Sequence, residues 1–281
     1  TENDPVGFFF PQQREKIDVF NYIKDELIAI DADLKESRTN EYGRVDKIAA
    51  KMLLAKLYLN AEVYIAQPKY AEAAAALEPV LNSSYQIANV PYKYLFMADN
   101  DVNGAQNEFI FPVRFDGQYT TSGGTNYLVH ASILSSMNAS DFGVDGGWKG
   151  LRTRREFVNK FADITGASDN RAMFHTTGQT LDIASIADET QGYGVTKWTN
   201  KRSDGSNGSN PSGAFVDTDF PLFRLADAYF IKAECLLRLG GYNGESEQVA
   251  ADLVTAVRQR AFKSDPGKAT VTVAQLKGGS R

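Results

Sequence analysis

The fold of this chain is decided by two neighbouring helix-forming stretches in its first third. Residues 46–64 read DKIAAKMLLAKLYLNAEVY, and residues 70–81 read YAEAAAALEPVL. Ile48, Leu53, Leu57 and others make the first stretch apolar over most of a helix surface, which is typical of a central helix. The alanines of the second stretch allow a neighbouring helix to approach closely. Because Pro68 separates the two stretches, we predict an antiparallel helical hairpin.

A similar hairpin is predicted towards the other end of the chain. Residues 222–239 and 245–261 carry helical patterns on either side of Gly240-Gly241, and an earlier helix is predicted over residues 17–34. The first helices of the two hairpins share an alanine and a tyrosine three residues apart, at Ala55/Tyr58 and Ala226/Tyr229. This spacing is typical of tetratricopeptide-like repeats, and two unrelated hairpins are the alternative. We expect the apolar run at 8–10 to be covered, and residues 263–281 to lack a closing element.

Composition excludes some classes of protein. The 281 residues are 43% hydrophobic and carry a net charge of -5. No stretch approaches the roughly 20 consecutive apolar residues of a membrane-spanning helix. An acidic chain is a poor partner for nucleic acid, which requires concentrated positive potential. Cys235, the single cysteine, lies within an apolar helical pattern and is predicted to be a buried, inert thiol.

The middle of the chain has a different character. Residues 83–219 hold most of the Gly, Asn, Ser and Thr, and short apolar runs such as 109–113 indicate strands. A long irregular stretch inside a helical protein is usually functional. We therefore expect ligand recognition to reside in this segment.

Several strings resemble the SusD-like (SusD/RagB) family of nutrient-binding outer-membrane lipoproteins, and they occur in family order. They are YGRV at 42–45, AAKMLLAKLYLN at 49–60, YLF at 94–96, DND at 99–101, EFIF at 108–111, GGWKG at 146–150, DNR at 169–171, DTDFPLFRLADAY at 217–229 and VRQRA at 257–261.

The resemblance implies a mainly α fold of tetratricopeptide-like helical hairpins, an α-α superhelix, with a long loop-rich insertion carrying short strands. The chain would be the internal part of a single SusD-like domain over residues 1–281. The hairpins would occupy about 12–82 and 220–262, and the loop-rich ligand-binding segment would occupy about 83–219.

The resemblance also implies a function. Members of this family capture oligosaccharides at the extracellular face of the bacterial outer membrane and deliver them to a TonB-dependent transporter. Closeness to the starch-binding founder of the family makes starch, an α-glucan, the first glycan to test. Family members are held by a lipid anchor in an N-terminal part that this sequence lacks, and Cys235 is not the lipidated cysteine.

Aromatic residues in glycine-rich or loop surroundings are the candidate carbohydrate contacts, because sugars lay their C–H faces on aromatic rings. Trp148 stands in a glycine frame, Tyr119 follows a strand-like run, and Trp198 has polar neighbours. Arg152 is the candidate for a bond to a sugar hydroxyl beside Trp148. A tryptophan is more often a core residue than a ligand contact, which is the structural alternative for each ring.

The acidic string that begins at Asp99 is a candidate metal site. Asp99, Asp101 and the later Glu108 alternate with other residues around a glycine, as in a loop that wraps calcium. The string departs from the EF-hand pattern, because the acid falls two places early. An Asx turn without metal is the alternative, and the resemblance implies one structural Ca²⁺ near such a string.

The parts of a catalytic site are missing from the sequence pattern. His130 and His175 stand apart without metal-ligand spacing, and Asp217 and Asp219 are better explained as caps of the following helix than as a glycosidase pair. We therefore predict a binding protein and not an enzyme. The rival hypothesis is a tetratricopeptide-like scaffold that binds a protein partner.

Overall fold

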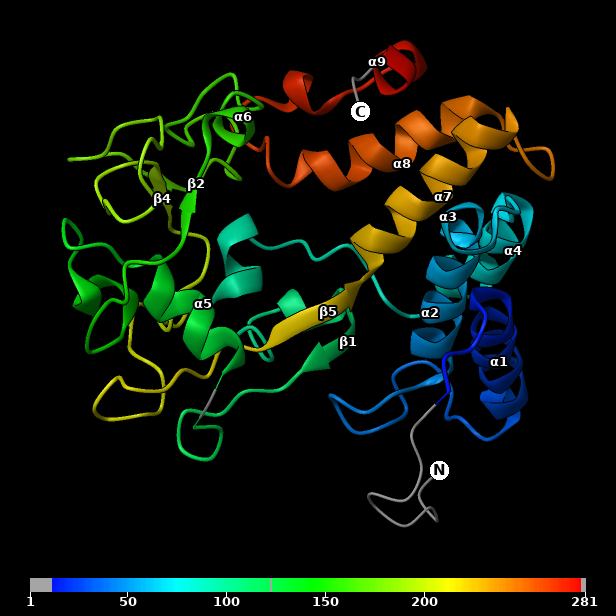
Figure 1. The fold of residues 1–281 in the computed structure, drawn as a ribbon, viewed down its shortest axis with the longest axis horizontal. Helices are drawn as coiled ribbons and strands as arrows, with labels where there is room; N and C mark the ends of the chain where they lie inside the picture. Colours follow the sequence, from blue (N-terminus) through cyan, green and yellow to red (C-terminus); the bar gives the residue numbers. More distant parts are fainter. Residues whose placement is uncertain (1–11, 122, 279–281) are drawn as a thin grey trace.

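Helices dominate the architecture of the chain (Figure 1), which the computed structural model describes over residues 12–121 and 123–278. The helices are α1 (Lys16–Ala29), α2 (Lys47–Leu59), α3 (Ala61–Ile65), α4 (Tyr70–Leu81), α5 (Gly124–Ser132), α6 (Arg155–Val158), α7 (Leu225–Leu239), α8 (Glu247–Gln259) and α9 (Val273–Gly278). The strands are β1 (Phe109–Val113), β2 (Arg152–Thr153), β3 (Phe174–His175), β4 (Tyr193–Val195) and β5 (Phe220–Arg224). The predicted mainly helical fold is confirmed, while the apolar run at 8–10 lies outside the described residues.

The main core lies where α7 crosses α2 and α4 (Figure 1). Met52 of α2, Leu77 of α4 and Ala228 of α7 are completely buried there. Small side chains at the contact, such as Ala74, let the helix axes approach one another, as the alanine-rich sequence predicts. Cys235 is buried in the same core, and burial raises the pKa of its thiol to about 12. The prediction of a buried thiol is confirmed.

Local polar contacts explain where the first helices begin and end. Asp46 caps α2 by accepting a hydrogen bond from the Ala49 backbone N–H at 2.9 Å. The predicted helix over residues 46–64 is divided at Asn60, whose side-chain amide donates back to the Lys56 carbonyl at 2.8 Å. An asparagine that bonds its own backbone competes with helix continuation, so α2 ends and the short α3 follows.

The second predicted hairpin begins later than its apolar pattern indicates. Residues 222–224 belong to β5, which pairs antiparallel with β1 in register Phe109↔Arg224 and Val113↔Phe220. Pro221 lies in this strand, and its ring is compatible with an extended edge. The predicted helix start at residue 222 is therefore wrong, and α7 starts at Leu225. The structure also corrects the expectation for residues 263–281, because a 3₁₀ turn (Pro266–Ala269) and α9 follow α8.

The loop-rich segment is connected to the helices through the β1–β5 ribbon (Figure 1). Apart from β1, its regular structure within the described residues is sparse: a three-stranded antiparallel sheet in the order β2-β4-β3, the helices α5 and α6, and short 3₁₀ turns. The pairs Thr153↔Tyr193 and Phe174↔Val195 define that sheet. The irregular backbone between these elements presents the candidate ligand contacts.

Candidate functional site

Trp148 forms an exposed aromatic platform together with a residue that sequence reasoning missed. Its side chain is 57% exposed, and its ring lies 6.2 Å from the ring of Tyr127, which is 48% exposed. The ring of His130 stacks beneath Trp148 at 4.9 Å and an interplanar angle of 16°. Tyr127 and His130 occupy successive turns of α5, three residues apart, so the helix presents both to the loop that carries Trp148.

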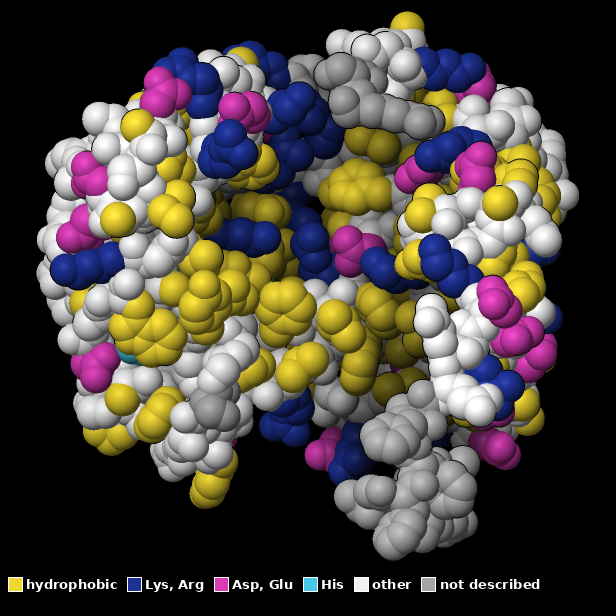
Figure 2. All heavy atoms as spheres, viewed as in Figure 1, with side chains coloured by type: hydrophobic (Ala, Val, Ile, Leu, Met, Phe, Trp, Pro, Cys, Tyr) yellow, Lys and Arg dark blue, Asp and Glu magenta, His cyan; other side chains and the backbone are white. Residues whose placement is uncertain are grey.

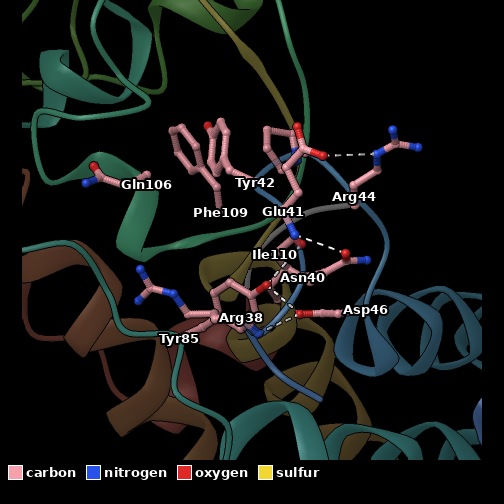
Figure 3. A pocket seen from close by; sticks show the side chains of 12 residues that line it. Arg38, Asn40, Glu41, Tyr42, Arg44, Asp46, Tyr85, Gln106, Phe109 and Ile110 are labelled. Atoms are coloured by element: carbon pink, nitrogen blue, oxygen red, sulfur yellow. Dashed lines mark hydrogen bonds and ion pairs between the residues drawn. The ribbon is translucent and has the colours of Figure 1, made fainter. Parts of the chain in front are cut away.

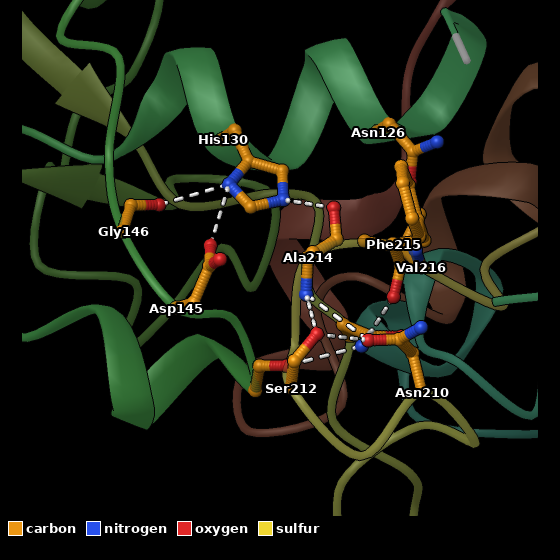
Figure 4. Close-up of polar contacts among 11 residues, drawn as sticks. Asn126, His130, Asp145, Gly146, Asn210, Ser212, Ala214, Phe215 and Val216 are labelled. Carbon is orange, nitrogen blue, oxygen red and sulfur yellow. Dashed lines mark hydrogen bonds and ion pairs between the residues drawn. The ribbon is translucent and has the colours of Figure 1, made fainter. Parts of the chain in front are cut away.

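His130 is the anchor of this platform (Figure 4). It is 2% exposed, and its Nδ1 and Nε2 lie 2.9 Å and 3.2 Å from the carbonyl oxygens of Gly146 and Ala214. Both ring nitrogens are thus engaged with backbone, and the ring face is covered by Trp148. The Trp148 backbone N–H in turn donates to the His130 carbonyl at 2.7 Å. These contacts hold Trp148 in a fixed orientation while its outer face remains open to solvent.

The glycine frame around Trp148 has a packing reason. A Cβ on Gly147 would lie 2.4 Å from the Ile133 carbonyl oxygen, a distance that real side chains do not tolerate, whereas a Cβ on Gly146 would meet open space. The Lys149 backbone N–H donates to the same Ile133 carbonyl at 3.1 Å. The loop therefore passes directly over the end of α5, and Gly147 permits that close approach.

The other predicted carbohydrate contacts do not gather at this platform. Tyr119 is 84% exposed in a turn fixed by Asp116, whose carboxylate accepts from the Gln118 N–H at 2.8 Å. Trp198 is packed as a core residue, with its ring stacked 5.6 Å from Phe220 and edge-on 5.0 Å from Phe96.

The guanidinium of Arg152 is engaged with backbone. It donates to the carbonyls of Ile186 and Gln191 at 2.7 Å and 2.9 Å, and also to that of Asp188. Its bonds brace the loop over residues 186–191. A sugar contact by Arg152, Tyr119 or Trp198 stays a prediction that these contacts do not test.

The three predicted calcium ligands do not converge. Glu108 is completely buried and forms ion pairs with Arg260 and with Arg224, the latter at 3.3 Å. Asp99 accepts hydrogen bonds from the Ser203 N–H at 3.0 Å and from its hydroxyl. Across residues 12–121 and 123–278, no group of three or more His, Cys, Asp or Glu side chains is arranged for a metal ion. The predicted set therefore does not fit one ion.

A different pair of acids, Asp101 and Asp219, lies close together. Asp219 is 2% exposed, its Oδ1 accepts from the Phe115 N–H at 2.7 Å, and its Oδ2 has no hydrogen-bond partner among the described residues. Burial, with a contribution from the nearby Asp101 carboxylate, raises the pKa of Asp219 to about 6. Burial also raises the pKa of Asp101. The Tyr42 hydroxyl lies beside the Asp219 carboxyl and lowers its pKa. A divalent cation between Asp101 and Asp219 would satisfy the remaining lone pairs of the two carboxylates.

Asp217 and Asp219 are not helix caps, so that prediction is wrong. Asp217 accepts from the Gly117 N–H at 2.6 Å and the Ser209 hydroxyl at 2.7 Å. The β5 strand separates both acids from α7. At the true helix start, Asp227 accepts from the Arg224 N–H at 2.9 Å.

The hollow beneath the loop at 38–46 has a structural role (Figure 3). Its volume is about 150 Å³, below the roughly 300 Å³ at which ligand pockets usually begin. Tyr85 donates from its hydroxyl to Asp46 at 2.8 Å, and the Arg38 N–H donates to the same carboxylate at 3.1 Å. These bonds tie the loop to the start of α2.

The two histidines do not form a hydrolytic centre. His130 is buried beneath Trp148, and His175 Nε2 lies 2.9 Å from the Ser136 hydroxyl. In the part of the chain that the structure describes, no carboxylate hydrogen-bonds to His175. The Ser–His pair consequently lacks the third group that orients the base in hydrolase triads.

Over the described residues, none of the helices combines the length and the apolar character that crossing a bilayer requires.

Comparison with known proteins identifies the family. The SusD family matches residues 168–275. The starch-binding protein SusD of Bacteroides thetaiotaomicron is 34% identical in an alignment that covers 82% of this chain and 49% of that protein. The chain thus spans about half the length of this curated relative.

Solved structures agree with this assignment at the level of the fold. Surface glycan-binding protein A from Bacteroides uniformis aligns with a TM-score of 0.64 and 19% identity, over 96% of this chain and 55% of that one. A SusD superfamily protein from Parabacteroides distasonis aligns with a TM-score of 0.59 and 23% identity, over 84% of this chain and 48% of that one. In its sequence match and its helical architecture, the chain resembles the SusD family.

Proposed function

We propose that this chain captures oligosaccharides without catalysis, through the platform formed by Trp148 and Tyr127. The supporting observation is the pair of exposed, preoriented rings, which offer a sugar an apolar surface without an ordering cost. Asp145, half-exposed beside His130, supplies a carboxylate within reach of the platform. Relatives named for binding starch or surface glycans support the same reading.

Starch-type α-glucans are the first ligands to test, because the curated relative is named a starch-binding protein. Location at the outer face of the outer membrane, anchoring by lipid and delivery to a TonB-dependent transporter are further parts of the proposal. They are supported by the family assignment and by the name of the Bacteroides uniformis protein.

Isothermal titration with maltoheptaose tests the proposal. Trp148→Ala should weaken binding by about 1–3 kcal/mol, on the scale of ring-stacking contacts, and Tyr127→Ala should weaken it less. Tyr22→Ala removes an equally exposed ring far along the chain on α1 and serves as the control. Failure of the folded protein to bind any neutral glycan of a broad panel would refute the proposal. Unchanged binding in Trp148→Ala would refute the platform.

We propose further that Asp101 and Asp219 hold one structural Ca²⁺ in this chain. The cation would neutralise two carboxylates whose burial otherwise disfavours their charge. Calcium should then raise the melting temperature of the wild-type chain at pH 7.5 relative to EDTA, and should have no effect on Asp219→Asn. An equal calcium response in both proteins would contradict this assignment.

A further inference from the structure

A basic groove lies between the loop-rich segment and the hairpin of α7 and α8, separate from the Trp148 platform. It consists of two hollows of about 430 Å³ and 560 Å³ that share Met173 and Lys197. Figure 2 shows Lys and Arg side chains gathered in a hollow between these two parts of the molecule. Each hollow has the size of a small-molecule site, and sites commonly form where two structural units meet.

The lining of this groove is strongly cationic although the chain as a whole is acidic. Lys160, Arg171, Lys197 and Arg258 line the first hollow, and Lys93, Lys201 and Arg202 extend the second. Asp141 is the one acidic residue among these lining residues. In a chain of net charge -5, such segregation concentrates positive potential in one concave place.

Most of these charges have no ion-pair partner among the described residues. Within residues 12–121 and 123–278, Arg171 is paired with Asp169 at 2.7 Å, but Lys93, Lys160 and Lys197 have no carboxylate within ion-pair distance. The Lys197 amine lies 4.2 Å above the centre of the Phe96 ring. Arg258 donates to the carbonyls of Ala269 and Lys268, both at 2.8 Å, which fixes the guanidinium. The nearby Asp169 carboxylate compensates part of the Arg258 charge but is itself paired with Arg171.

Aromatic rings line the same hollow as these cations. Phe157 of α6, Phe161 and Phe174 of β3 pack edge to face with ring centres 5.2 to 6.1 Å apart, and Phe157 is 53% exposed. An inorganic anion would contact only the cations of such a groove, and a neutral sugar would contact only the rings. A groove that has both fits a ligand with apolar ring faces and several negative groups.

We propose that this groove binds an acidic oligosaccharide, in which carboxylate or sulfate groups on the sugar rings pair with Lys160, Lys197 and Arg258. The sugar class of the ligand rests on the proposed function, whereas the anionic character rests on the groove itself. The groove would be a second site, which gives the chain a means to select charged glycans in addition to neutral ones.

Titration calorimetry with three oligosaccharides tests this proposal: an oligogalacturonate for carboxylates, a heparin-derived hexasaccharide for sulfates, and neutral maltoheptaose. At least one acidic ligand should bind, with affinity that falls as salt is raised from 50 to about 200 mM. Lys197→Met and Lys160→Met should each weaken that binding by roughly tenfold or more, as expected for a lost charged hydrogen bond. Lys69→Met, which removes a partly exposed lysine on the far hairpin, is the matched control.

The outcomes separate this proposal from the proposed function. Trp148→Ala should reduce maltoheptaose binding and leave acidic-glycan binding unchanged. The proposal of an acidic-glycan site is overturned by any of three results. Neither acidic ligand binds the folded protein, the two lysine variants bind the acidic ligands as the wild type does, or free sulfate at equal charge competes as well as the sulfated hexasaccharide. Binding of an acidic glycan without any neutral glycan binding would uphold the groove and overturn the Trp148 proposal.

Discussion

The buried charge cluster around Glu108 leads to the most decisive test of how this fold is held together. The Glu108 carboxylate is completely buried where β1 begins, and it pairs with Arg260 beyond α8 and with Arg224 at the end of β5. It also accepts the Ala88 backbone N–H at 3.0 Å. One side chain thus joins the loop-rich segment, the strand ribbon and the second hairpin.

Glu108→Gln keeps the shape of the side chain and removes its charge. Arg260 is 6% exposed and would remain charged without a counter-ion, which typically costs about 3–5 kcal/mol. With a denaturant slope near the upper end of the usual range, about 3 kcal/mol per M of urea, the unfolding midpoint should fall by roughly 1–2 M. The exposed Trp148 and the packed Trp198 provide the fluorescence signal for this transition.

Glu72→Gln is the matched control, because it makes the same chemical change in an exposed pair with Lys69. Exposed pairs contribute about 0–1 kcal/mol, so its midpoint should stay near that of the wild type. If Glu108→Gln lowers the free energy of unfolding by less than about 1 kcal/mol, the view that this cluster joins the parts of the fold is refuted. Calcium restoring the lost stability would also refute it, since the acid would then act as a metal ligand.

Two further changes test the groove and the platform. Gly147→Ala should displace the loop that carries Trp148, because its Cβ would lie 2.4 Å from the Ile133 carbonyl oxygen. The affinity for maltoheptaose should then fall about tenfold or more. Gly146→Ala is the control, because its Cβ meets open space, and it should bind maltoheptaose as the wild type does. Equal affinities for the two variants would show that the frame does not position the ring. Burial and the nearby Arg224 lower the pKa of Lys197 to about 8, so between pH 8 and 10.5 the unfolded chain binds the extra proton and wild-type stability should rise with pH. Lys197→Met should therefore be more stable than the wild type at pH 7, by about 1–2 kcal/mol once the lost Phe96 contact is subtracted. This difference in stability should shrink as the pH approaches 10. A Lys197→Met variant that is less stable than the wild type at pH 7 would contradict the lowered pKa of Lys197.

The sequence by itself determined the helical part of this protein. The apolar periodicity of residues 46–64 and 70–81 is a local property. The two helices can bury their apolar faces by packing against each other, which produces a helical hairpin. α4 has the same bounds as its predicted stretch, and β1 was predicted from its apolar run. The local pattern gives a wrong prediction where a segment pairs with a distant strand. Residues 222–224 have a helical apolar pattern, but in the fold they pair with β1 as part of a strand.

Tertiary structure decided the roles of the individual site residues. Trp148 and Trp198 have similar loop surroundings in the sequence, yet one is an exposed platform and the other packs against Phe96 and Phe220. Tyr127 became a candidate contact only because α5 brings it beside a loop twenty-one residues later. Glu108, at the end of an apparent metal string, meets two arginines from more than one hundred residues away. These contacts depend on long-range packing, which cannot be deduced from the spacing of residues along the chain.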